Sequence, residues 1–208
     1  MESIVKDYKP GASPLVLACS PRKGGNSDLA ARLIAEGLEA AGASPGLVFL
    51  RERDIMPCRG CQHCGEAPDF SCVLMKRDQA EDLFRLVLTA PALFFASPIY
   101  FYHVPAAFKG FIDRAQRYYV ARNSGDPVLN SLSGRPAHVV LVAGRSRGEK
   151  LFEGTMLTMK YFLWPFGARV AGDLRLHGID GPDDLRSDGK ARDAVREFAA
   201  KAWEKAKA

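Results

Sequence analysis

Residues 15–41 read LVLACSPRKGGNSDLAARLIAEGLEAA and contain a strand, a turn and a helix in direct succession. The first four residues, LVLA, form a short continuous apolar run that is typical of a strand buried on both faces. Glycine, serine and asparagine then mark a turn, and apolar residues recur at helical spacing to about residue 41. This succession is the repeating unit of a parallel sheet that is covered by helices.

The same alternation continues along the rest of the chain. Further buried strands are predicted at residues 46–50, 92–96, 137–143 and 168–176. Helices are predicted at residues 27–41, 78–89 (with Asp78 as the cap), 105–118, 148–163 and 183–206. Five such strands with short right-handed crossovers favour an α/β fold, a three-layer doubly wound five-stranded parallel sheet that is flavodoxin-like. Because no repeat or linker is visible, we expect one domain over residues 1–208, with a cysteine-rich insertion at about 51–77, the cysteine segment.

The composition is that of a globular domain with a sizeable core. Of the 208 residues, 47% are hydrophobic, which is enough to fold a single large domain. No apolar stretch approaches the roughly 20 residues that span a bilayer, and the polar residues 1–13 lack the core of a signal peptide. The net charge of +5 is spread among acidic residues, without a Lys/Arg block. We therefore expect a cytoplasmic protein with neither a nucleic acid nor a membrane as partner.

Four of the five cysteines lie close together, as Cys58, Cys61, Cys64 and Cys72. The spacing C-x2-C-x2-C-x7-C fits neither one helix face nor one strand face, but it suits a tight loop around a thiophilic centre. The triple C-x2-C spacing with a more distant fourth cysteine favours a cubane iron–sulfur cluster. Structural zinc and free or regulatory thiols stay open as alternatives. A disulfide is disfavoured because no export signal is seen.

In a doubly wound sheet, ligands bind beyond the carboxyl ends of the strands. The loop after the first strand offers Ser20, Asn26 and Ser27 as hydrogen-bonding side chains and Gly25 for close backbone approach. The free amides and the dipole of the helix start suit a phosphate, and Arg22 adds positive charge. The loop matches neither a triphosphate nor a dinucleotide motif, so a terminal monophosphate fits it better. An ordinary turn with capping residues is the alternative.

The loop after the third strand, ASPIYFYHVP at residues 96–105, contains three consecutive aromatic residues. Tyr100, Phe101 and Tyr102 could form the wall of a site for a flat heterocycle by stacking, or they could pack in the core or in a subunit interface. The loop after the fourth strand, at Gly144, could approach the same ring or be a plain turn. The cysteine segment follows the second strand, so we expect it to project from this edge of the sheet as well.

Three phrases, CSPRKGGNSDLA, MPCRGCQHC and ASPIYFYHVPAAFKGFIDR, resemble the NADPH-dependent FMN reductase family, and within it the iron–sulfur flavoprotein branch. The resemblance covers about residues 14–119. It implies a flavodoxin-like FMN-binding domain that forms a homodimer or homotetramer. By position, the FMN phosphate would be held by Ser20, Arg22, Gly25, Asn26 and Ser27. The isoalloxazine ring would be lined by Ser97, Pro98, Ile99, Tyr100, Phe101 and Tyr102. A [4Fe-4S] cluster would be held by Cys58, Cys61, Cys64 and Cys72.

These cofactors lead to three functional hypotheses, because FMN accepts a hydride and releases single electrons, while a cluster moves single electrons. The first is an FMN-dependent oxidoreductase that transfers electrons from NAD(P)H to a flavin, a quinone or a similar acceptor, without a catalytic acid, base or nucleophile. The second is an electron carrier between protein partners such as a ferredoxin, without a dedicated small-molecule substrate. The third is a flavin-binding protein whose cysteines hold zinc or act as a redox switch. The aromatic residues between positions 100 and 119 also predict self-association.

Overall fold

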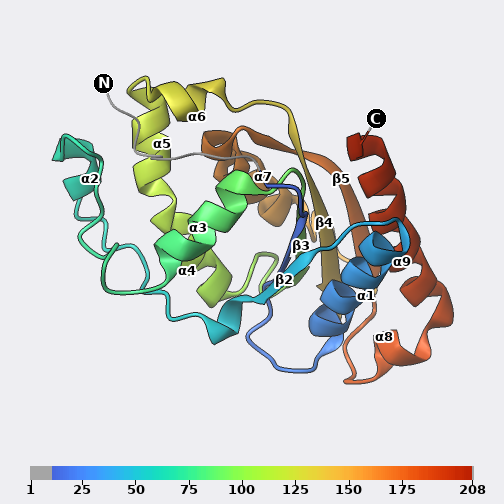
Figure 1. The fold of residues 1–208 in the computed structure, drawn as a ribbon. Helices are drawn as coiled ribbons and strands as arrows, with labels where there is room; N and C mark the ends of the chain where they lie inside the picture. The colour runs from blue at the N-terminus through green and yellow to red at the C-terminus, as the bar shows by residue number, and fades with distance from the viewer. Residues whose placement is uncertain (1–10, 208) are drawn as a thin grey trace.

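The computed structural model describes residues 11–207, which form a parallel sheet between two layers of helices (Figure 1). Its strands are β1 (Leu15–Ala18), β2 (Gly46–Phe49), β3 (Leu93–Pro98), β4 (Arg135–Ala143) and β5 (Ala168–His177). They pair in the order β2-β1-β3-β4-β5, and every neighbouring pair is parallel. The predicted flavodoxin-like fold is confirmed. Most of the polar start of the chain, residues 1–10, lies outside the described residues, as does residue 208.

The helices differ widely in length. The longer helices are α1 (Asn26–Ala40), α3 (Ala80–Thr89), α4 (Ala106–Arg114), α5 (Gln116–Asn123), α7 (Glu153–Leu163) and α9 (Gly189–Lys207). The short elements are α2 (His63–Glu66), α6 (Pro127–Ser131), α8 (Asp184–Ser187) and the 3₁₀ turns η1 (Leu50–Glu52) and η2 (Trp164–Phe166). Between residues 11 and 207, no helix combines the length and the apolar character needed to cross a membrane.

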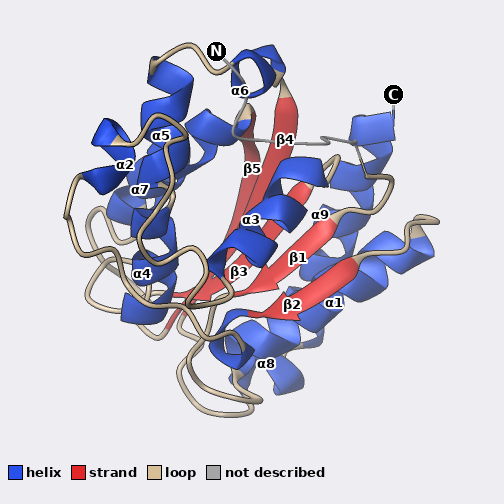
Figure 2. Cartoon of the chain, turned by 60° about the vertical axis from the view of Figure 1, so that its left-hand side comes forward, coloured by secondary structure: helices blue, strands red, loops and turns tan. Residues whose placement is uncertain are grey.

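Each central strand buries side chains on both faces of the sheet, between the two helical layers that Figure 2 shows. In β1, Leu15 and Leu17 pack in the cluster that contains residues of α3, α4, α5 and α7. Val16 and Ala18 pack in the opposite cluster, with residues of α1 and α9. Successive side chains of a strand point to opposite faces, so a strand covered on both sides must be apolar throughout. This requirement explains the LVLA run.

The structure divides two of the predicted helices and shortens a third. The helix expected at residues 105–118 ends at Arg114 and resumes as α5, because a tighter bond from the Ala115 N–H to the Ile112 carbonyl interrupts it. The helix expected at residues 183–206 is separated into α8 and α9, and α7 begins five residues after the predicted residue 148.

The prediction of Asp78 as a helix cap is wrong in position. The N-cap of α3 is Gln79, while Asp78 accepts a hydrogen bond from the Ala80 N–H with one carboxylate oxygen. Its other oxygen belongs to a buried ion pair with Arg114. Arg114 comes from a helix 36 positions later in the chain, and the local sequence around Asp78 carries no sign of it.

Candidate functional site

The loop after β1 is fixed by its own polar side chains. The Ser20 hydroxyl oxygen accepts a bond from the Arg22 N–H at 3.1 Å, and Asp28 accepts one from the Gly24 N–H at 2.7 Å. Asp28 is buried at the start of α1, where Arg51 neutralises it through an ion pair of 2.7 Å. The first N–H groups of any α-helix have no acceptor within the helix, and they carry the positive end of its dipole. The start of α1 is therefore suited to an anionic group.

The residues predicted to bind the phosphate do not all have the same role in the structure. Asn26 donates its amide N–H to the Gly181 carbonyl at 2.8 Å and accepts a bond from the Leu185 N–H at 3.2 Å. It therefore joins the start of α1 to the turn between β5 and α8. Gly25 occupies the N-cap of α1, and Ser27 is buried in its first turn.

Residues 100–103 form a tight hairpin turn next to this edge of the sheet. Tyr100 and His103 exchange two backbone hydrogen bonds, of 2.9 and 3.0 Å. Between them, Phe101 has a φ of 49° and Tyr102 a φ of 64°, in the left-handed region that bulky residues rarely adopt. The ring of Phe101 is nevertheless fully exposed. Backbone strain of this kind occurs most often at functional sites.

This turn forms part of a pocket of about 570 Å³ at the carboxyl ends of β3 and β4, which we call the aromatic pocket. Its lining residues are Ile99, Tyr100, Phe101, Tyr102, Ala143, Gly144, Arg145, Leu151 and Asp180. The structure thus brings five of the predicted ring-binding residues together. The other two, Ser97 and Pro98, end β3 and are described, but they are not part of this lining; Ser97 is fully buried and donates to the Pro98 carbonyl at 3.0 Å.

Two ionisable residues of the aromatic pocket were not predicted. The Arg145 guanidinium lies 5.8 Å from the centre of the Tyr102 ring. Asp180 lies close to Gly144: a Cβ atom at position 144 would be only 2.5 Å from the Asp180 carboxylate. The position therefore requires a residue without a side chain. The turn containing Asp180 follows β5 at the same edge, so sheet topology could have indicated it. Because Asn26 bonds to the next residue of this turn, it also helps to place Asp180.

The cysteine segment is closed at its neck by hydrogen bonds. Asp54 and Gln79 exchange two bonds, from the Gln79 N–H to the Asp54 carbonyl at 2.8 Å and from the Asp54 N–H to the Gln79 side chain at 2.9 Å. Met56 is held on both sides, since its N–H donates to Asp78 and its carbonyl accepts from Arg114, each at 2.9 Å. The segment is therefore a compact loop and not a loose insertion.

A second buried arginine holds the far side of the loop. Arg117 donates to the Phe70 carbonyl at 2.9 Å and to the Glu81 carboxylate at 2.5 Å. The Tyr118 hydroxyl donates to the same carboxylate oxygen at 2.8 Å. Burial, followed by the charge of Glu81, raises the pKa of Tyr118, so its hydroxyl stays a donor. Arg114 and Arg117 thus join the cysteine segment to α4 and α5.

All four predicted cysteines line one pocket of about 650 Å³, the cysteine pocket, together with Arg114 and Arg117. Burial raises the pKa of Cys64, and the neighbouring Cys72, Cys58 and Cys61 raise it further, so the four thiols influence one another. All of them are free thiols. Among residues 11–207, however, no three Cys, His, Asp or Glu side chains are grouped as a metal site would require.

The side chains of the cysteine pocket fit an anionic, sulfur-rich group. Four soft thiols are the ligands that iron–sulfur clusters use. Arg114 adds a buried positive charge, and its Nε and Nη2 atoms have no hydrogen-bond partner within the described part of the chain. A group with sulfur acceptors would satisfy these donors.

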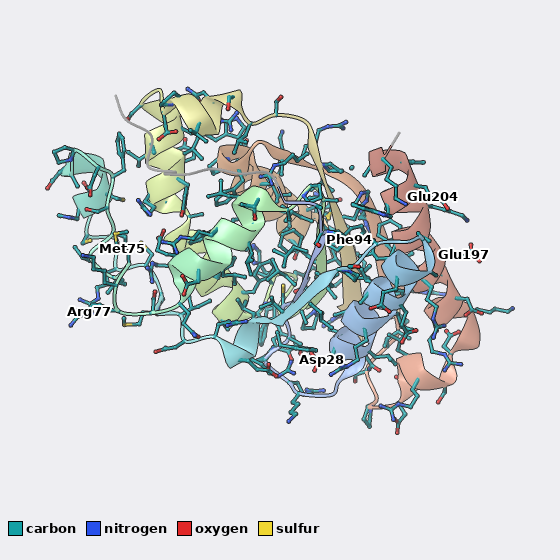
Figure 3. The ribbon with its side chains drawn as sticks, in the orientation of Figure 1. Asp28, Met75, Arg77, Phe94, Glu197 and Glu204 are labelled. Carbon is teal, nitrogen blue, oxygen red and sulfur yellow. The ribbon has the colours of Figure 1, made fainter. Side chains whose placement is uncertain are left out.

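The cysteine pocket lies apart from the edge that carries the aromatic pocket. Figure 1 shows α2 beside α5, and the two pockets share no lining residue among those described. In Figure 3, Met75 and Arg77 of the cysteine segment lie to the left, away from Asp28 at the start of α1. We expected the segment to project from the sheet edge, but Arg114 and Arg117 hold it along α4 and α5 instead.

Comparisons with known proteins agree with this geometry. Residues 14–170 match the family model described as NADPH-dependent FMN reductase, so the chain belongs to this family. It is 36% identical over 179 residues to an iron-sulfur flavoprotein of Archaeoglobus fulgidus, an alignment that covers 86% of this chain and 76% of that protein. It is 25% identical over 192 residues to an iron-sulfur flavoprotein of Methanocaldococcus jannaschii, covering 89% and 92% of the two chains.

A solved flavone reductase has the same fold, with a TM-score of 0.68 and 14% sequence identity. The alignment covers 94% of this chain, which spans only 63% of the length of that protein. At this level of identity the similarity shows the fold alone.

Proposed function

We propose that this chain is an FMN-dependent oxidoreductase that takes electrons from NAD(P)H and passes them to a flavin, a quinone or a similar acceptor. The observation that carries the proposal is the strained turn at Phe101 and Tyr102, which presents aromatic rings to a cofactor-sized pocket. Strain of this kind persists only where the surrounding structure maintains it, and it is common at ligand sites. A flat isoalloxazine ring is a natural stacking partner for these side chains, and membership of the FMN reductase family supports it.

In this proposal the two ends of FMN are held by different elements. The amides at Gly25 and Ser27, at the start of α1, bind the phosphate with Arg22, while Ser20 and Asn26 hold the loop in shape. The aromatic turn covers the ring and excludes water from it. FMN supplies the hydride and single-electron chemistry. Arg145 and Asp180 place one positive and one negative charge in the pocket, and Arg145 is the group that would attract an anionic ligand such as a nicotinamide nucleotide.

A Ser27→Asp variant tests the phosphate site. A like charge about 4 Å from a phosphate costs about 4 kcal/mol near a protein surface. The dissociation constant for FMN, measured by fluorescence titration, should therefore rise at least about 100-fold. Ser187→Asp, an exposed substitution at the end of α8, is the matched control and should bind FMN normally. Circular dichroism must show that both variants are folded. Full FMN occupancy in a folded Ser27→Asp protein would refute the assignment.

We also propose that Cys58, Cys61, Cys64 and Cys72 hold a [4Fe-4S] cluster, as the similarity to iron-sulfur flavoproteins supports. The exposure of Cys58 and Cys61 favours a second candidate function, an electron carrier that exchanges electrons with a protein such as a ferredoxin. Steady-state oxidation of NADPH and NADH with several small acceptors separates the two. Rapid turnover supports the oxidoreductase, whereas reduction only by a protein donor supports the carrier. Zinc in the purified protein would favour the third hypothesis, a zinc-bound or redox-switch loop.

We also propose that the chain associates with itself as a homodimer or homotetramer. Large apolar side chains of α5, α7 and η2 are exposed: Tyr119, Leu157, Tyr161 and Trp164. The rings of Tyr119 and Trp164 contact each other, with centres 5.5 Å apart, so these helices form one continuous apolar patch. Sedimentation at micromolar concentration should show a dimer or tetramer, and Tyr161→Glu should shift it toward a monomer. A wild-type monomer would contradict the proposal.

A further inference from the structure

Arg114 is incompletely bonded for a buried charge. Its side chain is 1% exposed, and Nη1 alone makes its hydrogen bonds, to the Met56 carbonyl and to Asp78. Nε and Nη2 are buried and have no partner among the described residues. A guanidinium presents five N–H donors in a fixed plane, of which these two atoms carry three. A buried donor left without an acceptor destabilises the protein.

The surroundings of Arg114 indicate what the missing acceptor is. Asp78 already satisfies one side of the guanidinium, and Arg114 also forms part of the wall of the cysteine pocket. Nε and Nη2 have no partner among the described residues, and the pocket that Arg114 lines is also lined by all four cysteines. An acceptor held by these cysteines would lie beside Arg114, and a cationic donor favours an anionic acceptor.

Arg117 differs from Arg114 in this respect, although both line the cysteine pocket. Arg117 donates through Nε to the Phe70 carbonyl and through Nη1 to Glu81. Both bonds of Arg117 hold other parts of the protein in place. Arg114 does the same through Nη1, but its buried Nε and Nη2 atoms make no hydrogen bond among the described residues. The contrast is that Arg114, unlike Arg117, has buried donors without a partner among the described residues.

We infer that Arg114 is a positioning residue for the cluster proposed above: its Nε and Nη2 groups donate to cluster or cysteinyl sulfur, and its charge stabilises the more reduced form. This inference rests on the proposed cluster. Sulfur atoms of a cluster accept hydrogen bonds, and such bonds and nearby charges set the reduction potential. A buried positive charge raises that potential, because it favours the state with one more electron.

Redox titration of anaerobically reconstituted protein, followed by absorbance, tests the inference. Arg114→Gln should lower the midpoint potential of the cluster, because a positive charge and its donors are lost. Asp78→Asn should raise it, because the negative charge that offsets Arg114 is removed while the Asn carbonyl oxygen can still accept from Arg114 and Met56. Both variants disturb the same ion pair. Arg59→Gln, a change at an exposed arginine of the same pocket, is the matched control and should shift the potential least.

The outcomes separate the inference from the proposed cluster. If wild type takes up no iron and sulfide, the cluster proposal is wrong and the inference falls with it. If wild type is loaded but Arg114→Gln and Asp78→Asn shift the potential in the same direction, or not at all, Arg114 is only structural. If Arg114→Gln does not fold, Asp78→Asn alone decides: a raised potential supports the inference, and an unchanged or lowered potential overturns it.

Discussion

The aromatic pocket and the cysteine pocket are held in place by different kinds of interaction. Backbone hydrogen bonds fix the aromatic pocket: Tyr100 and His103 exchange two, and the Ile99 N–H donates to the Val142 carbonyl of the neighbouring strand. The cysteine pocket depends on side chains instead. Two buried ion pairs, each joining residues 36 positions apart, fix Arg114 and Arg117, and these two arginines donate to the Met56 and Phe70 carbonyls of the loop.

This difference has a physical consequence for each site. A turn held by backbone bonds at the end of a strand keeps its shape whatever most of its side chains are. A loop held by buried ion pairs depends on each partner, because removing one leaves an uncompensated buried charge. We therefore expect the cysteine pocket to be sensitive to single substitutions far from the cysteines, and the aromatic pocket to be tolerant of them.

The largest effect is expected from Arg117→Ala. The substitution leaves Glu81 buried without its ion-pair partner and releases the Phe70 carbonyl, so the free energy of unfolding should fall by about 3–5 kcal/mol in urea titration. Arg85→Ala removes an exposed pair with Asp82 and should change stability by less than about 0.5 kcal/mol. Equal effects of the two variants would show that the buried pair does not hold the loop.

Acid should affect stability through two buried groups, His138 in β4 and Asp78 beside the cysteine pocket, at different pH values. Burial, then the charge of Lys205, lowers the pKa of His138 from 6.5 to about 4. Between these values the unfolded chain binds the proton and the folded chain does not. Stability should therefore fall by up to about 3 kcal/mol as the pH drops from 6.5 to 4.

Asp78 behaves differently: burial opposes the shift, but hydrogen bonds from Arg114 and backbone amides lower its pKa below 3.8. Its stabilising contribution is present above pH 3.8 and is lost only in stronger acid.

Urea titrations at several pH values measure how the free energy of unfolding depends on pH. His138→Leu should flatten the dependence between pH 6.5 and 4, because the buried ring is no longer there to be protonated. His63→Leu, at an exposed histidine of the cysteine segment, is the control and should keep the wild-type dependence. A flat wild-type curve over this range would contradict the assignment to His138.

The smallest effect is expected at the aromatic turn. Phe101→Gly relieves a positive φ that costs an L-residue about 1–2 kcal/mol, against about 0.5–1 kcal/mol for the added freedom of glycine in the unfolded chain. Stability should rise by up to about 1 kcal/mol, while FMN affinity falls about 5-fold because a stacking ring is lost. Phe101→Ala should lose the same affinity without the gain in stability. If the glycine variant is less stable than wild type, the turn is not strained.

The sequence predicted the fold and the aromatic pocket better than it predicted the side-chain contacts that hold the cysteine pocket. The LVLA run and the aromatic phrase are local patterns, and parallel topology brings the ends of their strands to one edge. Asp78 was predicted as a helix cap because its local sequence allows one, whereas its main partner is Arg114, in a distant helix. Asn26 was expected at a phosphate, yet its side chain bonds to a turn 155 residues away. Such pairings depend on tertiary packing and leave no local pattern.

We propose that one chain carries two separate redox sites, FMN at the sheet edge and a cluster in the cysteine pocket. Anaerobic reconstitution with iron and sulfide tests it most directly, with Cys61→Ser as the paired variant. The wild-type protein should bind about four irons and four sulfides per chain, and Cys61→Ser should bind clearly less while keeping its FMN. If wild type takes up no more iron and sulfide than Cys61→Ser, the cysteine pocket does not hold a cluster and the claim is wrong.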